Sequence, residues 1–289
     1  MIVSPVMGAT LWKLRGREID LSQRGMIMGV LNATPDSFSD GGEFFSAEKA
    51  IEHGLRMADD GAEIVDVGGE STRPGAEPVA VKEERRRVLP IIERLHDSTS
   101  AFISIDTSKA EVARAAIDAG ACIINDVTGG RGDPEMLPLV AARGSGFIIM
   151  HMQGTPRTMQ AAPKYGNVVA EVSDFFRQQY ERALNCGIDT MAIAFDPGIG
   201  FGKTLEHNLA LLGNLEQLRV HDRPLVVGVS RKAFLGKIVR SAEMADRAAP
   251  TIALTSVLRG RGADVFRVHD VRPNVAALRA AEAILGAAK

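Results

Sequence analysis

Short apolar segments recur along the chain, and amphipathic segments separate most of them. The apolar segments are continuous rather than alternating, which is the pattern of strands buried on both faces of a parallel sheet. Between them, residues 47–62, 109–121 and 173–188 place apolar side chains at helical spacing. The expected strands are 26–31, 63–68, 101–105, 122–125, 146–150, 191–195, 224–229 and 264–268.

Eight strands that alternate with helices in 289 residues predict a (β/α)8 TIM barrel. An open doubly wound sheet is the alternative, but no G-x-G-x-x-G motif follows the first expected strand. Because no Pro-, Gly- or Ser-rich linker interrupts the chain, we expect a single domain over residues 1–289. Residues 10–21 are expected to add a β-hairpin, with Arg-Gly or Gly-Arg at its turn and Trp12 packed against the bottom of the barrel.

Polar or charged residues follow every expected strand. In a barrel the carboxyl ends of the strands meet at one rim, where the active sites of such barrels lie. Asp, Asn, Ser and Thr also cap helices and form turns, but the Arg, Lys and His residues among them do not act as caps. We therefore expect one shared site, although His151 is equally consistent with a structural role. The residues are Asn32, Glu70, Ser71, Thr72, Arg73, Asp106, Asn125, Asp126, Met150, His151, Asp196, Ser230, Lys232, Arg267 and His269.

The chemistry of these residues falls into two sets. Asp106, Asn125 and Asp196 suit a flat heterocycle, because a carboxylate can accept two N–H groups at once. Cations and hydroxyl donors suit a phosphate or a carboxylate. A substrate with a heterocyclic head and a phosphorylated tail would fit both sets. The second set comprises Arg73, Ser230, Lys232, Arg267 and His269, and Asn32 with the acidic loop after it could hold a divalent cation against phosphates.

Composition argues against several classes of partner. The formal net charge is −2, the pI is about 6.3 and the chain has no long basic stretch, so nucleic acid is not expected. The first residues do not resemble a signal peptide, and no apolar run is long enough for a membrane span. Two isolated cysteines, Cys122 and Cys186, give neither a disulfide framework nor a zinc site, and Cys122 is expected to be buried. A cytoplasmic protein is the simplest interpretation.

One segment imitates a nucleotide-binding motif. Residues 196–204, DPGIGFGKT, end like a phosphate-binding P-loop. That pattern requires a glycine at the position where Pro197 stands. A nucleotide P-loop is therefore not predicted.

The loops, taken together and in this order, closely resemble those of the dihydropteroate synthase family. The resemblance covers essentially the whole chain, and the motifs are long and specific as a set. The matching segments are MGVLNATPDSFSDGG (28–42), VDVGGESTRPGA (65–76), SIDTSK (104–109), INDVTGG (124–130), MHMQGTPRTMQ (150–160), DPGIGFGKT (196–204), SRKAFLG (230–236) and FRVHDV (266–271).

The resemblance implies a barrel enzyme of folate synthesis. Such an enzyme joins 6-hydroxymethyl-7,8-dihydropterin pyrophosphate to p-aminobenzoate and releases 7,8-dihydropteroate and pyrophosphate. Because the electron-rich dihydropterin ring can delocalise a cation at the reacting CH2, we expect a dissociative displacement in which the enzyme stabilises the departing charge. The resemblance further implies Mg2+ as a cofactor, a homodimer, and competition by sulfonamides for the aminobenzoate site.

Residue roles follow from the same resemblance. The expected catalytic residues are Asp106, Asn125, Asp196, Lys232, Arg267 and His269. The pterin ring would be held by Asp106, Asn125, Asp196 and Lys232, with Met150 packed near it. The pyrophosphate would face Thr72, Arg267, His269 and Asn32, and Asn32 would also help to bind magnesium. The aminobenzoate site would comprise Phe38, Arg73, Pro74, Phe201 and Ser230, and Asp40 would help to order the site.

Two other functions share part of this pattern. A non-catalytic pterin-binding paralogue would keep the heterocycle set; the intact loops 32–42 and 70–78 argue against it but do not exclude it. A pterin-dependent methyltransferase domain would also keep that set, but it would not need the anion set or the STRPG and SRK segments.

Overall fold

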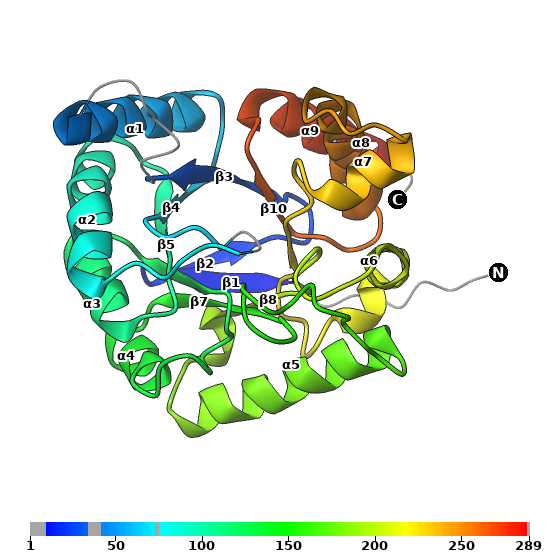
Figure 1. The fold of residues 1–289 in the computed structure, drawn as a ribbon, viewed down its shortest axis with the longest axis horizontal. Coiled ribbons are helices and arrows are strands. Elements are labelled where there is room, and N and C mark those ends of the chain that lie inside the picture. The colour runs from blue at the N-terminus through cyan, green and yellow to red at the C-terminus, as the bar shows by residue number, and fades with distance from the viewer. Residues whose placement is uncertain (1–9, 34–41, 73–74, 288–289) are drawn as a thin grey trace.

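The computed structural model describes residues 10–33, 42–72 and 75–287. Eight parallel strands form one curved sheet, and helices cover its outer surface (Figure 1). The strands are β3 (Met26–Asn32), β4 (Ile64–Gly68), β5 (Phe102–Asp106), β6 (Ile123–Asp126), β7 (Gly146–Met150), β8 (Ile193–Asp196), β9 (Val226–Val227) and β10 (Val265–Val268). The helices are α1 (Gly42–Asp59), α2 (Val81–Ser98), α3 (Ala110–Asp118), α4 (Met136–Arg143), α5 (Val168–Asn185), α6 (Leu205–Gly213), α7 (Ala233–Val239), α8 (Ala248–Arg259) and α9 (Val271–Ala287).

The sheet closes on itself. Its strands pair in the order β8-β7-β6-β5-β4-β3-β10-β9. A parallel bridge between Phe195 of β8 and Leu225, the residue before β9, joins the two edges. The predicted TIM-barrel fold is therefore confirmed.

All eight predicted strands agree with the observed ones within two residues at each end. The main difference is the segment 224–229, where only Val226–Val227 forms a strand. The N–H of Leu225 donates to the Asp264 carboxylate (2.8 Å) rather than to a neighbouring strand, so the ladder starts late. Likewise, residues Thr190–Ala192 form a 3-10 turn (η2) before β8, because the Asp189 carboxylate accepts the N–H of Met191 at 2.9 Å.

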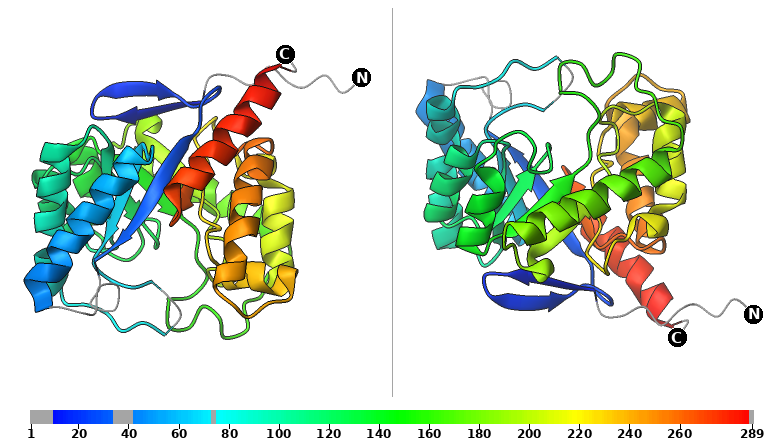
Figure 2. Two further views of the ribbon diagram at one scale, coloured as in Figure 1. Left: turned by 90° about the horizontal axis from the view of Figure 1, so that it is seen from above. Right: turned by 90° about the horizontal axis from the view of Figure 1, so that it is seen from below.

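The predicted hairpin lies across one end of the barrel (Figure 2). It pairs β1 (Leu11–Leu14) with β2 (Arg17–Asp20), and Arg15 and Gly16 form the turn with positive φ angles of 50° and 70°. These angles suit a tight two-residue turn between twisted strands. Trp12 is fully buried and donates its indole N–H to the carbonyl of Ala192 (2.9 Å), which confirms its predicted place at the bottom of the barrel.

A buried ion network strengthens the same end. The Asp264 carboxylate accepts hydrogen bonds from Arg219 (2.9 Å) and Arg259 (3.4 Å) as well as from the Leu225 N–H. Arg259 also donates to the carbonyl of Leu21, directly after the hairpin (2.9 Å). The network thus fastens the hairpin to the starts of β9 and β10, and the opposite end of the barrel remains for the loops that follow the strands.

Two further expectations can be compared with the structure. No helix in the described ranges is long and apolar enough to cross a membrane. Cys122 is buried as predicted, Cys186 is exposed, and both are free thiols.

Replacing Asp264 should destabilise the protein strongly. In Asp264→Ala the guanidinium of Arg219 and the N–H of Leu225 lose a buried acceptor, and removing one partner of a buried ion pair costs about 3–5 kcal/mol. Denaturant unfolding would measure this loss. The matched control is Asp174→Ala, because its ion pair with Arg177 is exposed on α5 and should contribute less than about 1 kcal/mol. Equal stability of the two variants would contradict the assignment.

Candidate active site at the carboxyl rim of the barrel

The pleat of the strands brings the predicted heterocycle set together. Residues two apart on a strand share a face, so one residue in two enters the barrel. The register places Gly68 beside Asp106, Asp106 beside Asn125, and Met150 beside Asp196. Asp106, Asn125, Met150 and Asp196 are all buried. These four side chains therefore form the bottom of the candidate site at the carboxyl rim, and we call them the floor.

Two carboxylates and one guanidinium lie at the centre of this floor. Arg267 donates from Nε to Asp66 Oδ2 (2.6 Å) and from Nη2 to Asp106 Oδ2 (2.7 Å). Asn125 donates from Nδ2 to the same Asp66 oxygen (3.1 Å). We call Asp66, Asp106 and Arg267 the buried triad. Asp66, beneath the floor, binds Asn125 and Arg267, and Arg267 in turn binds Asp106. One aspartate thus orients three predicted site residues.

That aspartate was missed in the sequence analysis. Asp66 is fully buried in the middle of β4, one layer below the rim. A signal was present: an aspartate within the apolar run EIVDVG is unusual, and its spacing of two from Gly68 places it on the inner face. Arg267 also differs from the expectation of a purely anion-binding residue, because its guanidinium pairs with the two carboxylates of the triad.

Burial controls the charge of the triad. It raises the pKa of Asp106 to about 7, against the effect of Arg267, and the negative charge of Asp66 adds to the rise. Within the described part of the chain, Asp106 Oδ1, Asp66 Oδ1 and Ser104 Oγ are buried without a hydrogen-bond partner. The floor therefore has unused acceptor capacity, which a ligand with several N–H groups could satisfy.

Asp196 and Lys232 form the side of the floor next to the loop after β8. Asp196 Oδ1 accepts the N–H of Gly198 at 2.7 Å, and burial raises the pKa of the Asp196 carboxyl. The Lys232 ammonium donates to the carbonyl of Ile199 and lies 4.7 Å from the centre of the Phe201 ring. Burial lowers the pKa of Lys232 to about 8, while Asp196 acts in the opposite direction. A cation, a carboxylate and an aromatic face thus meet at one wall.

The segment Ser230–Lys232 joins the last strand at the rim. Ser230 Oγ lies 3.0 Å from His269 Nδ1 and accepts the His269 N–H (3.2 Å). Arg231, between Ser230 and Lys232, has a left-handed backbone (φ 57°) and binds Asp270 with both Nε (3.1 Å) and Nη2 (2.5 Å). The ion pair holds a strained residue in place, and it positions the two predicted site residues beside it.

The remaining predicted residues divide into two groups. Asn32, at the end of β3 opposite Gly68, and Glu70, Ser71 and Thr72, after β4, are half-buried at the same rim. The others lie outside the described residues, and these are Phe38, Asp40, Arg73 and Pro74.

Two polar residues near the rim have structural roles. Asp126 caps the turn after β6, since its carboxylate accepts the N–H groups of Thr128 (2.8 Å) and Gly130 (2.9 Å). His151 Nδ1 lies 3.0 Å from the buried ammonium of Lys203. Burial and the Lys203 charge lower the pKa of His151 to about 3, so the imidazole is neutral and accepts a hydrogen bond.

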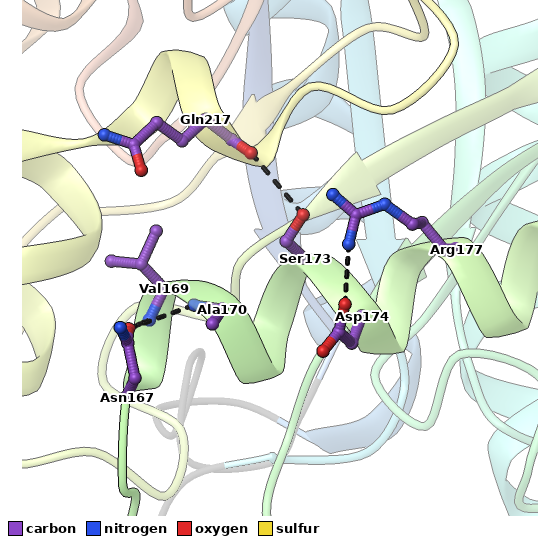
Figure 3. A pocket seen from close by; sticks show the side chains of 7 residues that line it. All are labelled: Asn167, Val169, Ala170, Ser173, Asp174, Arg177 and Gln217. Atoms are coloured by element: carbon purple, nitrogen blue, oxygen red, sulfur yellow. Dashed lines mark hydrogen bonds and ion pairs between the residues drawn. The ribbon is translucent and has the colours of Figure 1, made fainter.

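A separate hollow of about 360 Å³ lies along α5, outside the barrel (Figure 3). Its polar groups pair with each other: Arg177 binds Asp174 at 2.6 Å, and Ser173 donates to the Gln217 carbonyl at 3.5 Å. None of the predicted site residues lines it. We assign no chemistry to this hollow.

Comparisons with known proteins point to one family. A family model for pterin binding enzymes matches residues 28–269. A dihydropteroate synthase from Synechocystis sp. is 45% identical over 265 residues, which covers 92% of this chain and 92% of that protein. The structure of Xanthomonas albilineans dihydropteroate synthase with 4-aminobenzoic acid has a TM-score of 0.89 and 43% identity, and the match covers 96% of this chain and 99% of that one. A structure of the enzyme from the same organism in complex with 7,8-dihydropteroate has a TM-score of 0.86 and 41% identity, with coverage of 95% and 98%.

Asp66 should control the charge of its neighbour. In Asp66→Asn the triad loses one negative charge and Arg267 pairs more completely with Asp106, so the pKa of Asp106 should fall below its wild-type value of about 7. Carbon-13 NMR titration of aspartate carboxyl groups would measure the pKa. An unchanged pKa in the variant would show that Asp66 does not act on Asp106.

Proposed function

The chain belongs to the dihydropteroate synthase family and is a transferase of folate synthesis, and from this premise we propose how its residues act. The reaction joins 6-hydroxymethyl-7,8-dihydropterin pyrophosphate to p-aminobenzoate and gives 7,8-dihydropteroate and pyrophosphate. The observation that carries the proposal is the buried floor of Asp106, Asn125 and Asp196, with acceptor atoms left for a ligand. A pterin ring has N–H groups on its edge that match such a floor.

The floor would bind the pterin ring and no other part of the substrates. Asp106, Asn125 and Asp196 would hydrogen-bond its polar edges, and Lys232 would donate to a ring acceptor. Met150, which packs in a small apolar cluster with Val127, Met152 and Met159, would contact a ring face. Arg267, through the triad, would hold Asp106 at a fixed angle.

The pyrophosphate would lie above the floor, near the side chains that donate or carry positive charge. Thr72, Arg267 and His269 are the proposed contacts, together with Asn32. A magnesium ion fits this arrangement, because Mg2+ keeps several waters and is usually bound by one or two protein oxygens plus substrate phosphates. Among the described residues no group of three or more His, Cys, Asp or Glu side chains could hold a metal by itself. The amide oxygen of Asn32 would hold the ion, which when bound neutralises pyrophosphate charge.

The aminobenzoate would approach from the side of the loops after β3, β4 and β8. Phe201, half-buried beside Lys232, and Ser230 would border it in the described part of the chain. Phe38, Arg73 and Pro74 would complete the site and Asp40 would help to order it. We expect sulfonamides to compete there.

The proposed chemical step is dissociative. The bond between the substrate methylene carbon and the bridging oxygen breaks, and its electron pair leaves with pyrophosphate. The cation that remains is delocalised into the dihydropterin ring, next to the carboxylates of Asp106 and Asp196, which favour positive charge. The amine nitrogen of p-aminobenzoate then forms the new C–N bond and releases a proton to solvent. Because an aryl amine is already neutral at pH 7, no strong general base is needed.

We also propose a cytoplasmic homodimer. Large exposed apolar side chains lie on α6, α7, α8 and the segment between α7 and α8, and two more, Ile284 and Leu285, lie on α9. Figure 1 shows α6, α7 and α8 on one side of the barrel. A patch of this kind is typical of a protein interface. Analytical ultracentrifugation would test the dimer, and a monomer would refute it. The residues are Leu209, Ile238, Val239, Met244 and Val257.

Pyrophosphate release from the purified protein tests the function. With dihydropterin pyrophosphate and magnesium, release should depend on p-aminobenzoate and should yield dihydropteroate. Asp106→Ala should lower the rate roughly 100- to 1,000-fold, because it removes the carboxyl group proposed to hold the pterin ring next to the developing cation. Asp174→Ala, on the outside of α5, should leave it unchanged.

Other outcomes would identify the alternatives. Pterin binding without release of pyrophosphate would favour a non-catalytic paralogue. Activity with a methylated folate as donor would favour a methyltransferase, although that function does not explain the donors gathered at Ser230, Lys232 and His269.

A further inference from the structure

The loop between β4 and α2 is closed at its base by a single lysine. Loop 2 is defined here as residues 70–79, and it follows the strand that carries Asp66. Its first residue, Glu70, accepts the N–H of its last residue, Val79, at 2.9 Å. The Lys109 ammonium donates both to the Glu70 carboxylate and to the carbonyl of Val79 (2.8 Å). The two ends of the loop are therefore joined twice.

The same ammonium binds a third, more deeply buried group. Lys109 donates to Glu84 Oε2 (2.5 Å), and Glu84, on the first turn of α2, is only 1% exposed. The other oxygen of Glu84 accepts the hydroxyl of Thr107 (2.7 Å). Thr107 directly follows Asp106 of the buried triad. Lys109 thus connects loop 2, the start of α2 and the segment that carries a floor carboxylate.

The cluster contains one positive and two negative charges. One ammonium faces two carboxylates, and their effect exceeds that of burial, so the pKa of Lys109 is raised and the side chain stays charged. The loop start also packs closely on α2: a Cβ added to Gly69 would lie 2.8 Å from Val88, and Arg87 donates to the Gly69 carbonyl (3.0 Å). Hydrogen bonds and close packing on α2 therefore hold both ends of loop 2 in place.

We propose that Lys109 is a positioning residue for loop 2, which sets where Ser71 and Thr72 lie relative to the pterin floor. This inference rests on the proposed function, in which loop 2 faces pyrophosphate and aminobenzoate. The Lys109 ammonium binds Glu70, Val79 and Glu84, and none of these three is a floor residue. It acts through the two ends of the loop.

The experiment separates positioning from general stability. In Lys109→Met the loop loses its common donor, and kcat/KM for p-aminobenzoate should fall roughly 10- to 100-fold, because small displacements of binding groups have effects of that size. Affinity for 6-hydroxymethylpterin, which lacks the pyrophosphate and contacts the floor alone, should not change. Lys109→Arg should restore most of the activity, since the guanidinium can still bind both carboxylates. The matched control is Lys82→Met, an exposed lysine on α2.

A second measurement does not depend on activity. Hydrogen exchange of the Val79 amide should accelerate in Lys109→Met and in Glu70→Gln, because each weakens the closure of the loop. If the two residues act together, the increase in Val79 exchange in the double variant should be smaller than the sum of the increases in the two single variants.

The outcomes are distinguishable. Equal losses of pterin affinity and of aminobenzoate turnover, or unchanged Val79 exchange, would overturn the positioning role and leave Lys109 as part of the scaffold. Failure of the wild-type protein to form dihydropteroate would count against the proposed function instead, whereas the exchange and pterin-binding results would still decide whether Lys109 fixes the loop.

Discussion

The burial of Arg267 between Asp66 and Asp106 is the constraint on which the rest of the site depends. Charged groups are expensive to remove from water unless each has a partner, and here one guanidinium serves two carboxylates. One guanidinium does not neutralise two carboxylates, and burial together with the charge of Asp66 raises the pKa of Asp106 to about 7. A ligand that brings N–H groups or positive charge relieves this state. The same interaction orients the floor in the absence of substrate and favours the cation formed during the reaction.

The two ends of the barrel divide the tasks of stability and chemistry. At the bottom, the hairpin, Trp12 and the Asp264 network close the interior with apolar side chains and matched ions. In the buried inner layer above this closure, protein partners replace water around Asp66 and Asn125: Arg267 and Asn125 both donate to the Asp66 carboxylate. At the carboxyl rim, some site residues, such as Asp106 and Asp196, are at strand ends, and others lie on loops whose ends are held by hydrogen bonds. Lys109 is the clearest case of the second arrangement, because it fixes a loop without touching the floor.

Much of this architecture was predictable from local patterns, and the failures have physical reasons. Continuous apolar strands and polar residues at their ends indicated the barrel and its rim, since both are local in sequence. The sequence allowed either Arg-Gly or Gly-Arg at the hairpin turn. The structure shows Arg15–Gly16, and both residues have positive φ. Asp66 was missed because its partner Arg267 lies 201 residues away. The role of Asp126 as a cap could not be separated from a role in binding, because the same residue type serves both. Glu70 and Lys109 were overlooked as a pair for the same reason as Asp66: only the fold brings them together.

In the proposed reaction, buried carboxylates face a cation formed when pyrophosphate departs. The most direct test is the secondary deuterium isotope effect on a single turnover, with substrate deuterated at the reacting methylene. In a dissociative step the methylene carbon changes from sp3 towards sp2 before the amine attacks, which weakens the bending modes of its C–H bonds. The deuterated substrate should therefore react more slowly by a clearly measurable factor. The effect should persist in Asp106→Asn while the rate itself falls. An isotope effect near unity, with chemistry still limiting the turnover, would mean that the amine displaces pyrophosphate directly and that no free cation faces the floor.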